Sequence, residues 1–137
     1  MNRADFQKLA DLRLKEAKAL LDSKCYEGAY YLMGYAVECA LKACIAKQTQ
    51  QYDFPIKDSH KIYVHDLNNL LKLSGFAKEH GEESDKNEDF KLNWAIVKDW
   101  KEDARYSLDI TMDQAQTFYL AVSDEKDGVM PWLQKWW

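Results

Sequence analysis

The amino-acid sequence predicts an all-α fold with five helices. Apolar residues recur at intervals of three and four along most of the chain, as they do on one face of an α-helix. The alternation of apolar and polar residues that is typical of a strand never persists beyond a few residues. Proline, which interrupts helices, occurs only at Pro55 and Pro131.

The length and composition are those of one ordinary globular domain, residues 1–137. The chain has 137 residues, of which 47% are apolar and 31% are charged. Its 19 basic and 23 acidic groups give a net charge of -4. This balance argues against a broad basic face that grips nucleic acid, and nothing in the sequence is specific for DNA.

The first two helices are expected to be long. The first runs from about Ala4 to Ser23, with its apolar residues on one side. The second begins near Tyr26 and fades at residues 48–51, ahead of Pro55. Two glycines lower the helix propensity of this second helix and indicate that a neighbouring backbone approaches closely there. They are Gly28 and Gly34, and the deepest stripe of the same helix is Ala29, Met33, Val37, Ala40 and Cys44.

The remaining helices are shorter, and a charged segment separates the third from the fourth. We expect the third helix over about Asp66–Ala77 and the fourth from about Phe90 to Tyr106. The charged, glycine-containing residues 78–89 between them are predicted to form a mobile loop. The fifth helix starts at Thr111, because Thr-Met-Asp-Gln matches a capping box. Gly128 and Pro131 interrupt it before a cluster of terminal tryptophans, which we interpret as core or oligomer contacts.

The candidate functional residues begin with Glu38 and Lys42, which lie four residues apart in the otherwise apolar second helix. Charges in a helix that is nearly surrounded by protein need a local reason. One interpretation is a structural ion pair worth a few tenths of a kcal/mol. The other is a polar pocket between helices, in which the buried acid orients a base toward a ligand or toward Arg105.

Two further pairs of residues lie beside apolar sequence and allow the same two kinds of interpretation. His65 and Asp66 precede a leucine-rich helix, where Asp66 can simply cap the helix start while His65 packs over it. Arg105, next to Tyr106, can cap carbonyls or pair with a nearby acid, or it can bind phosphate with its fixed fork of donors.

Several classes of site are not indicated by the sequence. His60 and His65 are five residues apart without further ligands at metal-binding spacing, so no metal or other cofactor is expected. Glycine-rich phosphate loops, nucleophile elbows and H-E-x-x-H pairs are absent. The N-terminal residues lack a signal-peptide pattern, the charges of the second helix argue against a membrane span, and the three cysteines are odd in number. We therefore expect a cytoplasmic protein with reduced thiols.

The chain resembles the HEPN superfamily of small helical bundles over nearly its whole length. The resemblance is carried by residues 13–47, by HDLNNLL at 65–71, by a tryptophan-containing helix that ends in ARY at 104–106, and by a last helix that ends in aromatic residues. The first block, with Tyr-x-x-Ala and Glu-x-x-x-Lys inside an apolar helix, is the most specific. The resemblance implies a four- to five-helix up-and-down bundle, commonly dimeric and often encoded beside a minimal nucleotidyltransferase or within toxin–antitoxin and antiviral systems.

Nucleotide or RNA binding is the function that the resemblance implies. Many members of the superfamily are metal-independent ribonucleases with an Arg followed, after four to six residues, by His. No His follows Arg105 in this chain, which argues against catalysis because the 2′-hydroxyl chemistry needs an imidazole. His65 or His80 could replace it only by approaching Arg105 in space.

Three hypotheses follow. The first is a non-catalytic module that binds a nucleotide, RNA or a protein partner in a polar groove lined by Glu38, Lys42, His65, Arg105 and Tyr106. The second is a ribonuclease toxin in which Arg105 holds the phosphate and a distant His is the base. The third is a structural dimerisation module, with the tryptophan end buried between two chains.

Overall fold

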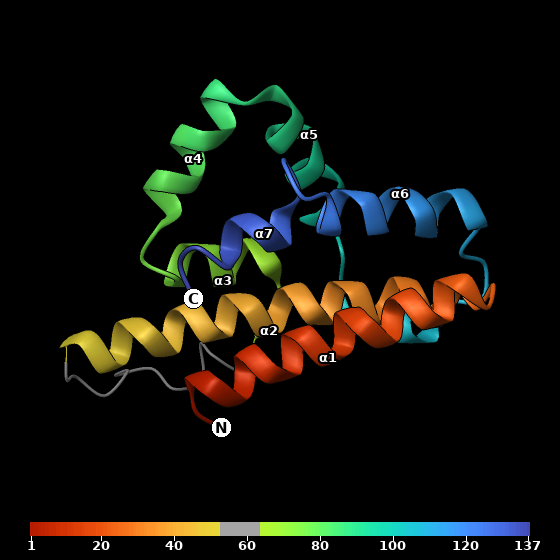
Figure 1. The fold of residues 1–137 in the computed structure, drawn as a ribbon, viewed down its shortest axis with the longest axis horizontal. Coiled ribbons are helices and arrows are strands. Elements are labelled where there is room, and N and C mark those ends of the chain that lie inside the picture. Colours follow the sequence, from red (N-terminus) through yellow and green to blue (C-terminus); the bar gives the residue numbers. More distant parts are fainter. Residues whose placement is uncertain (53–63) are drawn as a thin grey trace.

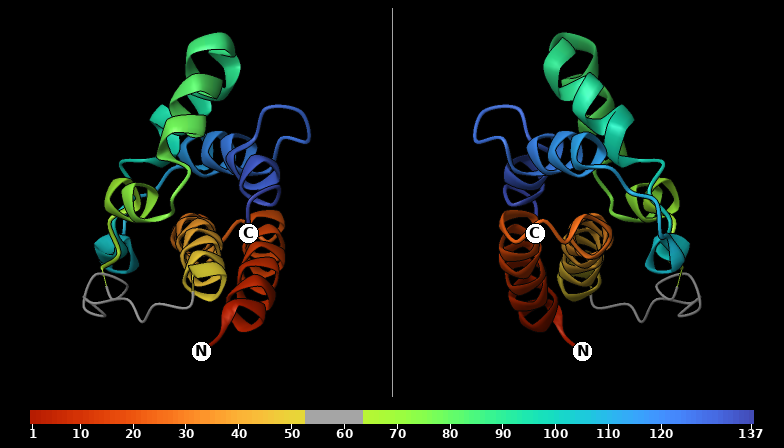
Figure 2. Two further views of the ribbon diagram at one scale, coloured as in Figure 1. Left: turned by 90° about the vertical axis from the view of Figure 1, so that its left-hand side faces the viewer. Right: turned by 90° about the vertical axis from the view of Figure 1, so that its right-hand side faces the viewer.

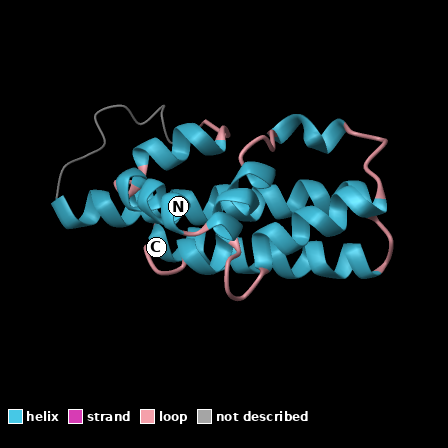
Figure 3. Ribbon diagram, turned by 90° about the horizontal axis from the view of Figure 1, so that it is seen from above, coloured by secondary structure: helices cyan, strands magenta, loops and turns pink. Residues whose placement is uncertain are grey.

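The computed structural model describes residues 1–52 and 64–137, and the side chains of 1–48 and 64–137. Over these residues the protein consists of seven α-helices and one 3-10 helix joined by loops, and this described part contains no strand (Figures 1 and 3). The prediction of an all-α fold is therefore confirmed for the described part of the chain.

Helices α1 (Arg3–Asp22) and α2 (Tyr26–Tyr52) form a long antiparallel hairpin (Figure 1). Helix α1 starts with a capping box: the Asn2 side chain accepts from the Asp5 amide at 2.9 Å, and the Asp5 carboxylate accepts from the Asn2 amide at 3.0 Å. Both helices begin and end close to the predicted residues.

Helix α2 lies at the centre of the molecule. Helix α1 contacts it on one side, and α3 (Leu67–Leu73) and the 3-10 helix η2 (Glu102–Tyr106) contact it on the other. Helices α6 (Met112–Ser123) and α7 (Val129–Leu133) cover a third side (Figure 2). The predicted deepest stripe of α2 is confirmed, since each of its five members is at most 2% exposed. A helix covered on so many sides must be apolar nearly all round, which is the character of the α2 sequence.

The prediction of a mobile loop over residues 78–89 is wrong. Helix α4 spans Ala77–Lys86, and α5 (Glu88–Val97) follows after Asn87, whose side chain accepts from the Phe90 amide at 3.1 Å. Most residues of α4 are good helix formers, and burial of His80 docks it on α5 and α7. Charge alone therefore did not prevent a helix here.

The prediction of a continuous fourth helix to Tyr106 is also wrong. Helix α5 ends at Val97, the chain turns so that Trp100 is buried, and η2 then begins at Glu102. Helix η2 therefore leaves the axis of α5 and lies beside α2.

The third helix is likewise shorter than predicted, because Gly75 at φ 86° ends it before α4 starts.

The predicted start of α6 at Thr111 is confirmed, whereas the predicted interruption at Gly128 and Pro131 is wrong, because α6 already ends at Ser123. Thr111 Oγ1 accepts from the Gln114 amide at 3.1 Å, and Gln114 Oε1 accepts from the Thr111 amide at 2.9 Å. Pro131 lies in the first turn of α7, where its missing N–H costs no hydrogen bond. Trp132 is buried within its own chain, and its ring centroid lies 5.3 Å from that of Phe76.

Among the described helices, none combines the length with the hydropathy that a membrane-spanning segment requires. All three cysteines carry free thiols: Cys25 is exposed, whereas Cys39 and Cys44 are buried. Burial raises the pKa of both buried thiols to about 12.

The thiols are therefore expected to differ in reactivity. At mildly alkaline pH in native buffer, Cys25 alone should react with a disulfide reagent such as DTNB, because the buried thiols are inaccessible and stay protonated. All three should react in denaturant. Spectrophotometric titration of the native protein measures this, and the Cys25→Ser variant should give no fast reaction. Rapid reaction of a second thiol in the folded protein would contradict the burial of Cys39 and Cys44.

Candidate functional site

Glu38 of α2 is the one buried acid among the described residues, with 1% of its side chain exposed. Each of its carboxylate oxygens has a cationic or imidazole partner. Oε2 accepts from Lys42 Nζ at 3.4 Å, and Oε1 lies 2.7 Å from His65 Nδ1. The shorter contact crosses between elements, so Glu38 does more than close one turn of its own helix.

His65 continues the network toward η2. Its second ring nitrogen, Nε2, lies 2.9 Å from Glu102 Oε2. A neutral imidazole has one N–H, so the ring donates to both carboxylates only when both of its nitrogens are protonated. Glu38, Lys42, His65 and Glu102, here called the Glu38 cluster, thus connect α2, the segment before α3, and η2.

The Glu38 cluster runs from the interior to the surface. Side-chain exposure rises from 1% at Glu38 and 11% at Lys42 to 39% at His65 and 42% at Glu102. Removing one partner of a buried charge leaves the other uncompensated, so the inner residues have to remain paired. The outer two lie at the solvent end of the cluster, where η2 also carries Arg105.

Arg105 and Tyr106 lie next to the Glu38 cluster on η2, outside its hydrogen-bond network. Arg105 stacks on Tyr106, with its guanidinium carbon 4.8 Å from the ring centroid. A hydrogen bond to Tyr106 raises the pKa of Arg105, and the negative charge of Glu102 acts in the same direction. Within the described residues Arg105 forms no ion pair, and Tyr106 is 71% exposed.

Two tyrosines extend this face of α2 toward its N-terminus. Tyr31 stacks on Tyr35 at 6.2 Å and on the buried Trp100 at 6.1 Å between ring centroids. Because only Lys101 separates Trp100 from η2, this stack fixes where η2 lies against α2. Tyr31, Tyr35, Glu38 and Lys42 therefore follow one another at helical spacing on the face of α2 beside η2.

The structure brings together three of the five predicted site residues, Glu38, Lys42 and His65. Glu102 was not predicted, since no motif marks it apart from its place three residues before Arg105. The prediction that Asp66 caps α3 is confirmed, because its carboxylate accepts from the Asn69 amide at 2.9 Å. The prediction that His65 packs over that helix start is wrong, because its ring lies between Glu38 and Glu102.

The other histidines do not join the Glu38 cluster in the part of the chain that is described. His80 is buried in α4 among aromatic rings, and His60 lies outside the described residues. Among the described residues no group of three or more His, Cys, Asp or Glu side chains could hold a metal ion.

In comparisons with known proteins, no protein-family model, curated protein or solved structure matches this chain.

Proposed function

We propose that this protein is a non-catalytic, HEPN-like module that binds a nucleotide or RNA beside the Glu38 cluster. The proposal includes the four- to five-helix up-and-down arrangement of that superfamily. It also includes its usual partners, a second copy of the chain and a minimal nucleotidyltransferase in a toxin–antitoxin or defence setting. The sequence resemblance supports these parts, and the geometry of the Glu38 cluster supports the place of binding.

The observation that carries the proposal is a buried carboxylate that fixes two cationic or imidazole side chains beside an exposed arginine. Glu38 holds Lys42 and His65 in place from the interior. Arg105, whose donors are free of any ion pair within the described residues, lies on the adjoining η2. Lysine and arginine side chains on adjoining elements are suited to donating to a phosphate. The exposed ring of Tyr106 offers a surface on which a base can stack.

The non-catalytic part of the proposal is supported by the surroundings of His65. Both of its ring nitrogens face carboxylates, so neither is free to take a proton from a 2′-hydroxyl. No histidine follows Arg105 in the sequence, and His80 is buried away from solvent. These features favour binding over cleavage.

Calorimetric titration with a panel of mononucleotides and a short single-stranded RNA, in the presence of chelator, tests the proposal. We expect saturable binding of one class and at least a tenfold weaker affinity for Arg105→Ala, because one charge-assisted contact is worth about 1.5–3 kcal/mol. Lys42→Met keeps the aliphatic stem and should weaken binding similarly, and it should also lower the melting temperature because it removes one of the two partners of the buried Glu38. Arg105 is exposed, so its variant should keep the wild-type melting temperature.

Lys91→Ala provides a matched control, because Lys91 is an exposed cation on α5. Its affinity should equal that of the wild type. Absence of saturable heat across the panel, or unchanged affinity in both site variants, would overturn the proposal. Cleavage of the RNA in chelator that is lost in Arg105→Ala would instead establish the ribonuclease hypothesis.

A further inference from the structure

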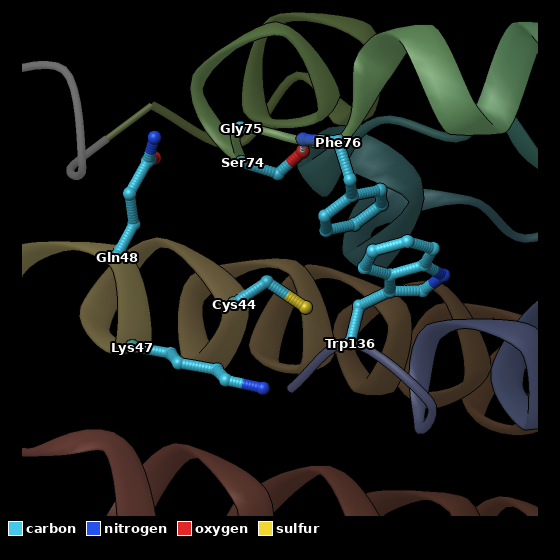
Figure 4. Close-up of a pocket in the computed structure, with 7 residues that line it drawn as sticks. All are labelled: Cys44, Lys47, Gln48, Ser74, Gly75, Phe76 and Trp136. Atoms are coloured by element: carbon cyan, nitrogen blue, oxygen red, sulfur yellow. Dashed lines mark hydrogen bonds between the residues drawn. The ribbon is translucent and has the colours of Figure 1, made fainter. Parts of the chain in front are cut away.

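A cavity lies where the C-terminal half of α2 faces the turn between α3 and α4 (Figure 4). It has a volume of about 240 Å³. Three segments distant in sequence contribute to it: α2, the turn that contains Gly75, and the chain after α7. The lining residues are Cys44, Lys47, Gln48, Ser74, Gly75, Phe76 and Trp136.

The cavity has a polar side and an aromatic side. Lys47 and Gln48 extend from α2 on one side, the rings of Phe76 and Trp136 stand on the other, and Cys44 lies between them (Figure 4). The two rings are stacked, with centroids 5.5 Å apart and planes at 17°. Such a site combines a flat apolar wall with hydrogen-bond donors, as small-molecule sites commonly do.

One cation, Lys47, lines this cavity. Arg3 lies outside the lining, and its guanidinium donates to the Trp137 carbonyl at 2.5 Å. Within the described residues no ion pair joins Lys47 to a carboxylate. Two buried donors near this end of the molecule, Arg3 Nε and Trp136 Nε1, also have no hydrogen-bond acceptor there.

We propose that this cavity binds a small aromatic carboxylate, with its ring against Phe76 and Trp136 and its negative group facing Lys47. A cavity of about 150 Å³ is enough for benzene, so about 240 Å³ holds one ring with a carboxylate. It is below the size range of pockets for larger ligands, which favours a single-ring ligand over a whole nucleotide. The proposal is therefore independent of the function assigned to the Glu38 cluster.

Titration of the ¹⁵N-labelled protein with benzoate, followed by NMR, tests this inference. Saturable shifts are expected at the Trp136 indole N–H, assigned with Trp136→Phe, and at the Gly75 amide. Lys47→Met should weaken benzoate binding at least tenfold, because it removes the charge but keeps the stem. Benzyl alcohol, which has the ring without the charge, should bind at least tenfold more weakly than benzoate.

Lys91→Met serves as the matched control, and its benzoate affinity should equal that of the wild type. The melting temperature of Lys47→Met separates a lost contact from a lost fold. The inference is overturned by absence of saturable shifts up to about 10 mM benzoate, a concentration that detects even millimolar affinity. Equal binding of benzyl alcohol, or unchanged benzoate affinity in folded Lys47→Met, would also overturn it.

Discussion

Replacing Gly34 by alanine is expected to destabilise the protein by about 3 kcal/mol, the upper end of the usual cost of overpacking. A Cβ at this position would lie 2.1 Å from Trp100 Cε2 and 2.2 Å from two further atoms of the same ring. Trp100 is 1% exposed and stacks on Tyr31, so the ring has no space into which it can withdraw. Equilibrium unfolding in urea measures the loss as a lower midpoint.

Gly81→Ala is the matched control for Gly34→Ala. A Cβ on Gly81, in α4, would meet no atom within 4 Å, so alanine should stabilise that helix by up to about 1 kcal/mol. Combining Gly34→Ala with Trp100→Leu should cost less than the sum of the two single changes, because the smaller side chain leaves room for the methyl group. A wild-type urea midpoint for Gly34→Ala would contradict the close contact.

The same substitution is expected to affect the Glu38 cluster at a distance. Trp100 is the last buried residue before η2, which carries Glu102 and Arg105. Moving its ring away from α2 would therefore move Glu102 away from His65. On the proposed function, Gly34→Ala should therefore weaken ligand binding although Gly34 itself is buried and lies outside the Glu38 cluster.

The sequence was informative where one residue type has one dominant physical role. The spacing of Thr111 and Gln114 fits a capping box at a helix start, and the structure shows both hydrogen bonds of that capping box. The apolar periodicity of α2 located its buried stripe, because a covered helix leaves this pattern in the sequence. Glu38 and Lys42 were conspicuous for the complementary reason, since charge in such a helix needs a partner.

The sequence was uninformative where the outcome depended on tertiary contacts. Gly34 was predicted to admit a neighbouring backbone, but a tryptophan ring from 66 residues later occupies the space. Glu102 lies in a run of charged residues, and only the turn after Val97 brings it to His65. Helix α4 was missed because its polar composition resembles a loop, while the burial that docks it rests on His80, its single buried residue.

That docking makes His80 the second residue for which a large effect is expected. Its ring is 4% exposed and packs edgewise against Phe90, Trp94 and Trp132, at centroid distances of 5.1, 4.7 and 5.2 Å. Within the described residues Nε2 has no hydrogen-bond partner. Burial lowers the pKa of His80 from 6.5 to about 4. Between about pH 4 and pH 6.5 the imidazole of His80 therefore binds a proton in the unfolded chain but stays neutral in the folded protein.

The sign of the pH dependence follows from this difference. Above pH 6.5 the imidazole is neutral in both the folded and the unfolded state, so its titration does not change the free energy of unfolding. As the pH falls from 6.5 to about 4, the unfolded chain takes up the proton first, so the free energy of unfolding decreases. The full loss is about 3 kcal/mol, because each pKa unit corresponds to about 1.4 kcal/mol. Below pH 4 this residue contributes no further loss.

Urea unfolding of the wild type and of His80→Leu, measured between pH 4 and pH 7.5, isolates this contribution from that of the carboxylates. The variant fills a similar volume without a titrating group, so the stability difference between the two proteins should shift by about 3 kcal/mol in favour of the variant at low pH. The fluorescence of Trp94 and Trp132, which contact the imidazole, should report the release of α4 in the wild type. Parallel pH profiles for the two proteins would show that the His80 imidazole is solvated in the folded state, and would remove it as the anchor of α4.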